Sequence, residues 1–286
     1  MKKLGCIFAL AIIVLAAVFG YQYWPSQQSQ STPSASIFQV TFLDVGQADA
    51  ITIQSGDSTM LIDAGGNSTA DSLVKTLQTM GFNKFDVVIG THPHEDHIGG
   101  LDAVINQFEI GTIYMPKVTA TTKTFEDVIE AIEDKGLSVT TPVPGTSFNL
   151  GQAVCTLLAP NSQSYEDLNN YSIVIRIQYN QNCFLFMGDA ETDSEKEILA
   201  KDFSVKADVL KVGHHGSSSS TSGSFLSSVN PQFAVIMVGK DNDYGHPHQE
   251  TLDKLNSAGI GIYRTDLNGT ITFTSDGTNL QVSTEK

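Results

Sequence analysis

Thr91-His-Pro-His-Glu-Asp-His-Ile-Gly-Gly100 is the stretch that decides the fold of this chain, because it places three of the seven histidines within six consecutive positions. It follows residues 85–89, an apolar run rich in β-branched side chains that predicts a buried strand. Pro93 excludes a regular helix inside the cluster, so we expect a loop at the carboxyl end of that strand. So dense a histidine cluster favours metal binding over an ordinary polar loop.

The spacing within this loop predicts two neighbouring metal ions. Imidazole and carboxylate groups are ligands that suit Zn²⁺ and Mn²⁺. A loop can direct two pairs of side chains toward two ions. We expect His92 and His94 to face one ion, and Asp96 and His97 to face the other.

Two later apolar runs predict strands that end in the same kind of residue. Residues 183–187 run into Gly188-Asp-Ala-Glu191, and residues 207–212 run into Gly213-His-His-Gly-Ser217. Strands of an α/β sheet bring their carboxyl ends to one edge, where sites are built. We therefore expect Asp189 to bridge both ions and one histidine of the later loop to complete the second ion.

Asp63 follows a further predicted strand, residues 59–62, and precedes Ala64-Gly-Gly66. An aspartate followed by glycines commonly only forms a turn. In this context we expect Asp63 to support the metal loop by orienting one of its ligands. In the Tyr244-Gly-His-Pro-His248 loop, we expect His246 to close the pocket over bound substrate.

The chain of 286 residues has a net charge of -15, with 41% hydrophobic residues and 24 glycines, which fits a loop-rich globular enzyme. Lys2 and Lys3 are the only charged residues before residue 37, so the remainder carries 14 basic against 31 acidic residues. This excess of negative charge opposes tight binding to the backbone of long DNA. It is compatible with a phosphodiesterase that holds its substrate locally through metals.

The N-terminus predicts a membrane segment. Two lysines precede an apolar stretch of about 20 residues, long enough to span a bilayer. Residues 1–24 are thus a signal anchor or a cleaved signal peptide, and the aromatic group Tyr21, Tyr23 and Trp24 favours the anchor. Residues 25–36 form an uncharged linker and residues 37–286 a folded domain. We expect the domain at the extracellular face of the membrane, tethered through residues 4–24, or secreted.

Strand-like and helix-like runs alternate through the folded region, which predicts an α/β (α+β) sandwich of two mixed sheets covered by helices. Helical periodicity is clearest over residues 71–80 and 125–135. Cys155 and Cys183 lie in apolar runs, which favours buried free thiols over a disulfide.

Several motifs in this order resemble the soluble metallo-β-lactamase domain of ComEC-like competence proteins and its stand-alone relatives. Besides the histidine loop they are Phe42-Leu-Asp-Val-Gly-Gln-Ala-Asp49, Leu61-Ile-Asp-Ala-Gly65, Asn169-Asn-Tyr-Ser-Ile-Val174, Met187-Gly-Asp-Ala190, Leu210-Lys-Val-Gly-His-His-Gly-Ser217 and Tyr244-Gly-His-Pro-His248. The resemblance begins near residue 38 and implies a four-layer αββα sandwich. The multi-helix channel of those proteins has no counterpart here, so import of DNA is not implied.

The resemblance also implies roles for individual residues. By analogy with phosphorylcholine-esterase-like members, His215 is a metal ligand and His214 contacts the substrate or transition state. Ser217 and Thr221 are expected to donate hydrogen bonds to a phosphate, although the serine-rich run around them is equally typical of a flexible loop. Many relatives have a further histidine on the first metal, where this chain offers Asn169 and Asn170, so His92, His94 and Asp189 alone are expected to hold that ion.

The expected function is a metal-dependent hydrolase, most simply a phosphodiesterase or nuclease. Two divalent ions, Zn²⁺ or Mn²⁺, would lower the pKa of a bridging water, and His214 would stabilise developing charge. Asp96 and Asp189 would also orient the nucleophile. The expected substrate is nucleic acid, a nucleotide or teichoic acid, and no protein partner is predicted. The alternatives are hydrolysis of an ester or amide, including a β-lactam, and a metal-binding module without turnover.

Overall fold

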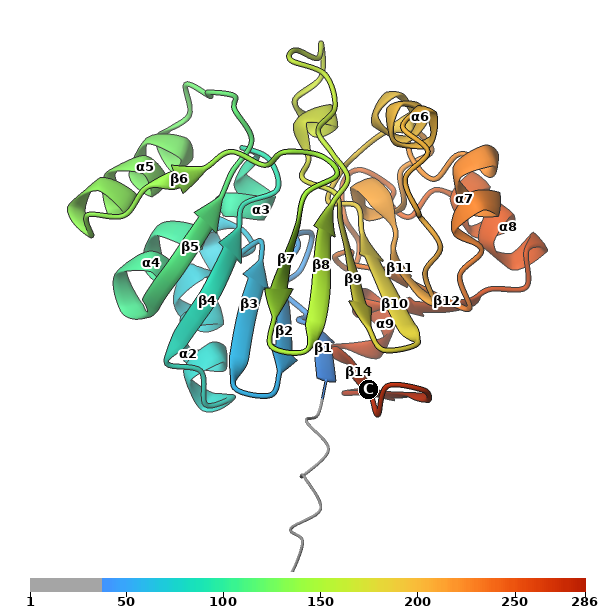
Figure 1. The fold of residues 1–286 in the computed structure, drawn as a ribbon, viewed down its shortest axis with the longest axis horizontal. Helices are drawn as coiled ribbons and strands as arrows, with labels where there is room; N and C mark the ends of the chain where they lie inside the picture. The colour runs from blue at the N-terminus through green and yellow to red at the C-terminus, as the bar shows by residue number, and fades with distance from the viewer. Residues whose placement is uncertain (1–37) are drawn as a thin grey trace, which may run out of the picture. The chain divides into compact units, whose positions relative to one another are not determined.

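The computed structural model describes residues 38–286, which form two facing β-sheets (Figure 1). The first sheet has eight strands in the order β15-β14-β1-β2-β3-β4-β5-β6. Their bounds are β1 Phe38–Phe42, β2 Ile51–Ser55, β3 Ser58–Ile62, β4 Lys84–Ile89, β5 Glu109–Tyr114, β6 Val139–Thr140, β14 Ile271–Ser275 and β15 Leu280–Thr284. Antiparallel pairing from β15 to β3 gives way to parallel pairing from β3 to β6.

The second sheet has seven strands in the order β13-β12-β11-β10-β9-β8-β7. Their bounds are β7 Ser147–Leu150, β8 Ala153–Leu157, β9 Ile175–Tyr179, β10 Asn182–Phe186, β11 Val209–Lys211, β12 Phe233–Ile236 and β13 Gly261–Arg264. Strands β10 to β13 are parallel. Each sheet therefore contains a parallel half, and the loops after its strands open on one edge.

Helices cover the outer side of each sheet (Figure 1). On the first sheet these are α2 Ala70–Thr79, α4 Leu101–Gln107 and α5 Lys123–Asp134; on the second they are α6 Thr192–Ala200, α7 Gly223–Val229 and α8 Gln249–Ser257. Short helices are η1 Asn67–Thr69, α3 Glu95–Ile98, η2 Leu168–Tyr171, η3 Gly213–Gly216 and α9 Thr265–Asn268. Buried residues of α2, α4 and α5 share one core with the first sheet, and those of α6, α7 and α8 share another with the second.

A third core fills the space between the sheets. Alternate residues of β1 (Phe38, Val40 and Phe42) point into it together with Phe184 and Phe273, as the period of two in a strand requires. Two sheets with an inner core and a helical layer on each outer side make a four-layer αββα sandwich. The predicted fold class is confirmed.

Helices α2 and α5 lie within a few residues of the predicted ranges 71–80 and 125–135. Part of the serine-rich run begins helix α7, where the Ser222 hydroxyl accepts a hydrogen bond from the Phe225 amide. Cys155 and Cys183 are buried and free. Among residues 38–286 no helix is both long and apolar enough to cross a membrane; the predicted anchor and linker lie outside the described residues.

Candidate metal centre

The histidine loop follows β4. Asp63, which directly follows β3, contacts this loop and holds it in place. The Asp63 carboxylate is fully buried. One of its oxygens accepts a hydrogen bond from the Thr91 amide at 2.8 Å, and the other lies 2.7 Å from Nδ1 of His97. Because Nδ1 is engaged, His97 presents Nε2 to the neighbouring carboxylates. The structure thus has Asp63 in the orienting contact expected from the sequence.

Four side chains converge beside this loop, and each offers one ligand atom within 4.8 Å of the others: Asp96, His97, Asp189 and His215. Nε2 of His97 lies 3.2 Å from Oδ1 of Asp189, and Nε2 of His215 lies 3.2 Å from Oδ2 of Asp96. Ligand atoms bound at about 2 Å to one tetrahedral ion stand roughly 3.3 Å apart. The spacing therefore fits one divalent ion.

The chemistry of these atoms also fits a metal. Nε2 of His97 and Oδ1 of Asp189 are buried and face each other at 3.2 Å without good hydrogen-bond geometry, and neither has another hydrogen-bond partner. Such atoms are costly unless an ion engages them. Burial opposes ionisation of Asp189, but the nearby His97 and His215 outweigh it and hold its pKa well below the usual value. A donor set of two imidazoles and two carboxylates suits Zn²⁺ or Mn²⁺.

His92 and His94 form a second group that shares Asp189 with the first. Nε2 of His92 lies 3.0 Å from Nδ1 of His94 and 4.0 Å from Oδ2 of Asp189. Burial lowers the pKa of His92 well below the usual value, so the ring is neutral, as a metal ligand must be. Oγ of Ser172 lies 3.3 Å from Nδ1 of His92 and accepts the Asp189 amide at 3.0 Å. Asp189 thus lies farther from His92, at 4.0 Å, than from His97, at 3.2 Å.

The two adjacent histidines of the η3 loop point in different directions. Both have left-handed backbones, with φ of 48° at His214 and 50° at His215, a conformation that costs about 1–2 kcal/mol per residue and is frequent at functional sites. Nδ1 of His215 lies 2.8 Å from the Met237 carbonyl oxygen, which leaves Nε2 for the metal group. Nε2 of His214 is 3.8 Å from Oδ2 of Asp189. The geometry places His215 in the first group, with Asp96, His97 and Asp189, and His214 beside that group.

Asn169 and Asn170 lie near Glu191, at the start of α6. The Asn170 amide group donates to Oε2 of Glu191 at 3.4 Å, and Oδ1 of Asn170 accepts the Glu191 backbone amide at 3.1 Å. Asn169 donates to Oε1 of Glu191 at 3.5 Å. Glu191 in turn lies 3.1 Å from Nδ1 of His214. The asparagine pair therefore supports the residue that orients His214.

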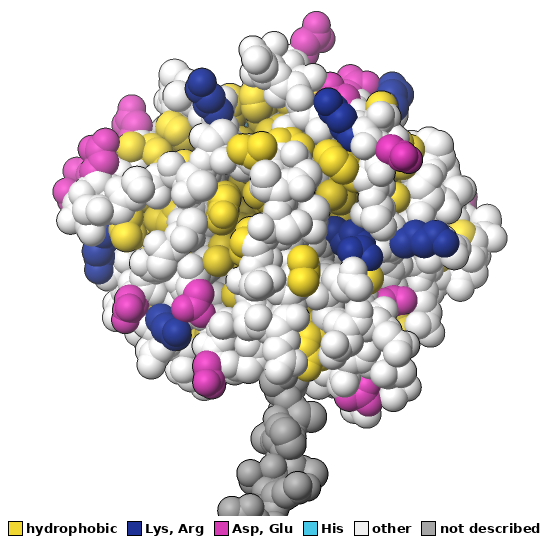
Figure 2. All heavy atoms as spheres, in the orientation of Figure 1, with side chains coloured by type: hydrophobic (Ala, Val, Ile, Leu, Met, Phe, Trp, Pro, Cys, Tyr) yellow, Lys and Arg dark blue, Asp and Glu magenta, His cyan; other side chains and the backbone are white. Residues whose placement is uncertain are grey.

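A cavity of about 470 Å³ opens over the metal group. It is lined by Gln47, His94, Glu95, Asp96, Asn169, Asp189, His214, His215, Tyr244 and His246. His92 and His97 are fully buried beneath it. On the face seen in Figure 2 acidic and basic side chains are interspersed, and no histidine is exposed there.

Of the three residues expected to bind substrate, the structure brings only His246 to this cavity. The hydroxyl of Ser217 pairs with that of Ser219 at 2.9 Å. Thr221 is buried, and its amide donates to Oε1 of Glu195 at 2.5 Å. The phosphate-binding roles of Ser217 and Thr221 stay predictions.

The sequence analysis missed a buried ion pair under the site. Nζ of Lys211 lies 2.7 Å from Oδ2 of Asp49, and both side chains are almost inaccessible to solvent. Oδ1 of Asp49 lies 3.4 Å from Nδ1 of His215, and the Asp49 amide donates to the Asp96 carbonyl oxygen at 3.1 Å. The pair joins β11 to the loop before β2, and Asp49 contacts two of the expected ligands, His215 and Asp96. A lysine inside an apolar strand was the clue, since a buried charge needs a partner.

Residues 43–240, more than half of the chain, match the Metallo-beta-lactamase superfamily. The chain belongs to this superfamily. Its members are generally metal-dependent hydrolases, which agrees with the ligand cluster. YhfI from Bacillus subtilis has the same fold, with a TM-score of 0.56 and 15% identity over 84% of this chain and 100% of YhfI.

Two competence proteins are similar in sequence. ComE operon protein 3 of Bacillus subtilis (strain 168) is 30% identical over 253 residues, 82% of this chain and 33% of that protein. Competence protein ComA of Neisseria gonorrhoeae is 28% identical over 265 residues, 92% of this chain and 35% of that protein. The predicted resemblance to competence proteins is confirmed, and the chain spans about a third of the length of these relatives.

Proposed function

We propose that this metallo-beta-lactamase-fold chain is a phosphodiesterase that works with two divalent ions, Zn²⁺ or Mn²⁺. The observation that carries the proposal is the position of Asp189. Its Oδ1 faces His97 at 3.2 Å, and its Oδ2 faces His92 at 4.0 Å and His215 at 3.5 Å. A carboxylate shared by two histidine groups is the arrangement expected of a bridging ligand. The likeness to competence proteins favours nucleic acid or nucleotides over teichoic acid.

In this proposal His92, His94 and Asp189 hold one ion, and Asp96, His97, Asp189 and His215 hold the other. Bound divalent ions would supply Lewis acidity and activate water for hydrolysis of a phosphodiester. The chain orients these groups and excludes bulk water from His92 and His97, which are fully buried. His214 presents Nε2 to the cavity, held by Glu191 at 3.1 Å from Nδ1, and is placed to contact a phosphoryl oxygen.

The test is a metal and activity assay on the full chain, purified without chelator. Bound metal is quantified, and hydrolysis of bis-p-nitrophenyl phosphate is followed while Zn²⁺ or Mn²⁺ is titrated. The proposal expects cleavage that depends on metal and is lost in Asp96→Ala. Bound metal with cleavage only of a chromogenic ester or β-lactam would replace the phosphodiesterase assignment. Metal without any turnover would favour a binding module.

We also propose that residues 4–24 tether the domain to the extracellular face of the membrane. The support is the length of the apolar segment and the two lysines before it. Protease added to intact cells should degrade a membrane-bound form of the full chain. Recovery of a shortened chain in the medium would indicate a cleaved signal peptide instead.

A further inference from the structure

Tyr244 lies at the metal cavity with its side chain in solvent. At 68% exposure it is the most exposed large hydrophobic side chain among residues 38–286. It lines the same cavity as Asp96 and Asp189. An exposed aromatic ring is a surface on which a planar group of a ligand can stack.

The tyrosine is the outermost of a series of rings that leads to the metal group. Its ring stacks on His246, with centroids 5.6 Å apart and planes 22° apart. His246 meets His214 edge to face, with centroids 5.3 Å apart. A group stacked on the outer side of Tyr244 would therefore lie along the same wall as the residues proposed to contact the phosphate.

Hydrogen bonds hold the loop that carries these rings. The side-chain amide of Asn242 donates to the carbonyl oxygens of Gly239 at 2.9 Å and His246 at 2.7 Å, and Oδ1 of Asn242 accepts the His246 amide at 3.0 Å. Nε2 of His248 lies 3.3 Å from the Tyr244 carbonyl oxygen. A loop fixed in this way presents its ring without a large loss of conformational entropy on binding.

Charge indicates what the ring binds. No lysine or arginine lines the cavity, and the folded region carries 14 basic against 31 acidic residues. Contacts along a phosphate backbone are therefore weak, and affinity beyond the metal-bound phosphate must come from uncharged contacts. Base stacking on an aromatic ring is such a contact, and it requires an unpaired base.

We propose that Tyr244 stacks on a nucleobase next to the cleaved phosphate, so that the substrates are nucleotide phosphodiesters or single-stranded nucleic acid rather than a polymer of polyol phosphates. The proposal rests on the phosphodiesterase function and names its substrate class. Tyr244 is in this view the residue that determines specificity.

Two substrates with one leaving group test the proposal on the full chain. p-Nitrophenyl thymidine 5′-phosphate carries a base, and methyl p-nitrophenyl phosphate does not. We expect Tyr244→Ala to lower kcat/KM for the thymidine substrate about tenfold, through KM, and to leave the methyl substrate unchanged. Tyr244→Phe should keep the wild-type preference. Leu267→Ala removes another exposed side chain, 61% exposed, and should change neither substrate.

Equilibrium dialysis with thymidine 5′-monophosphate gives a measurement independent of turnover. Tyr244→Ala should weaken this binding about tenfold and Tyr244→Phe should not. Two outcomes would overturn the stacking role. In one, Tyr244→Ala lowers kcat/KM equally for both substrates; in the other, it changes neither kcat/KM nor the binding of thymidine 5′-monophosphate. Cleavage of neither substrate by the wild-type chain would instead defeat the phosphodiesterase function, and dialysis would then still decide whether Tyr244 binds a base.

Discussion

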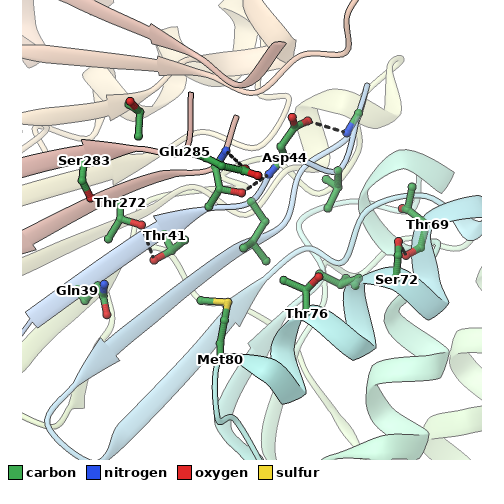
Figure 3. Close-up of a pocket in the computed structure, with 16 residues that line it drawn as sticks. Gln39, Thr41, Asp44, Thr69, Ser72, Thr76, Met80, Thr272, Ser283 and Glu285 are labelled. Carbon is green, nitrogen blue, oxygen red and sulfur yellow. Dashed lines mark hydrogen bonds between the residues drawn. The ribbon is translucent and has the colours of Figure 1, made fainter. Parts of the chain in front are cut away.

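Two of the cavities among residues 38–286 differ in character. The larger, about 800 Å³, lies between the first sheet and helix α2, and eight of its sixteen lining residues are Ser or Thr (Figure 3). The smaller, about 470 Å³, lies over the loops that follow β4, β10 and β11. Volume alone would direct attention to the larger one.

The polar groups of the two cavities differ in whether they have hydrogen-bond partners. In the larger one the Thr41 and Thr272 hydroxyls pair at 3.2 Å, and Asp44 binds Nζ of Lys286 at 3.1 Å. At the smaller one, buried Nε2 of His97 and Oδ1 of Asp189 face each other at 3.2 Å without good hydrogen-bond geometry and have no other hydrogen-bond partner. Unsatisfied buried groups and shifted pKa values mark functional sites better than size does. This difference favours the smaller cavity as the proposed metal site.

The largest expected effect comes from Asp189, the carboxylate that both histidine groups share. Asp189→Asn keeps the shape of the side chain but removes its charge, so the two groups lose their common anionic ligand. We expect kcat/KM for a phosphodiester to fall by more than about a hundredfold. This exceeds the loss that is typical when a residue that hydrogen-bonds a metal ligand is replaced. The measurement is kcat/KM together with bound metal per chain. Full activity with a normal metal content would show that Asp189 is not a metal ligand.

Asp63→Asn is expected to have the next largest effect. Asp63 does not line the cavity but holds Nδ1 of His97 at 2.7 Å, and partners of this kind typically change metal affinity 10–100-fold. Titration with a competing chelator should show weaker binding of Zn²⁺ or Mn²⁺. Because Asp63 also holds Thr91, circular dichroism must first show that the variant is folded. An unchanged affinity in a folded variant would contradict the orienting role.

Metal affinity should also rise with pH. Burial opposes a charge on His97, but Asp189, Asp63 and Asp96 outweigh it and raise its pKa well above the usual value. The metal-free chain therefore keeps a proton on His97 at neutral pH, and metal binding must release it. Apparent affinity should increase by up to about tenfold per pH unit for each proton released, from pH 6 toward the raised pKa. Chelator competition at several pH values would measure this increase in affinity. The slope of the logarithm of affinity against pH should be shallower in Asp63→Asn.

The fold and the centre of the site could be predicted because their determinants are local. His92 to His97 lie within six residues of each other, and Asp189 and His215 follow apolar strands whose ends meet at one edge. Three apolar runs ending in residues of ligand type therefore sufficed to predict that Asp96, His97, Asp189 and His215 lie together.

The surroundings of the site could not be predicted, because they depend on contacts between distant segments. Glu195, on α6, is buried and accepts the amides of Thr221 and Ser222, so the serine-rich loop is drawn toward α6 rather than to the cavity. Tyr244 reaches the cavity because Asn242 closes its loop. No local pattern in the sequence encodes either contact.

The smallest expected effects belong to the larger cavity, and they test the comparison directly. Thr41→Val leaves the Thr272 hydroxyl without its partner and should lower the free energy of unfolding by about 1 kcal/mol, whereas the double change with Thr272→Val replaces both hydroxyls by methyl groups and should be closer to neutral. Denaturant unfolding measures both. Hydrolysis of the phosphodiester should stay within about twofold of wild type in each variant, since neither side chain touches the metal group. A larger loss of activity in the stable double variant would mean that the larger cavity takes part in function, and that satisfied hydroxyls can mark a site as well as unsatisfied carboxylates do.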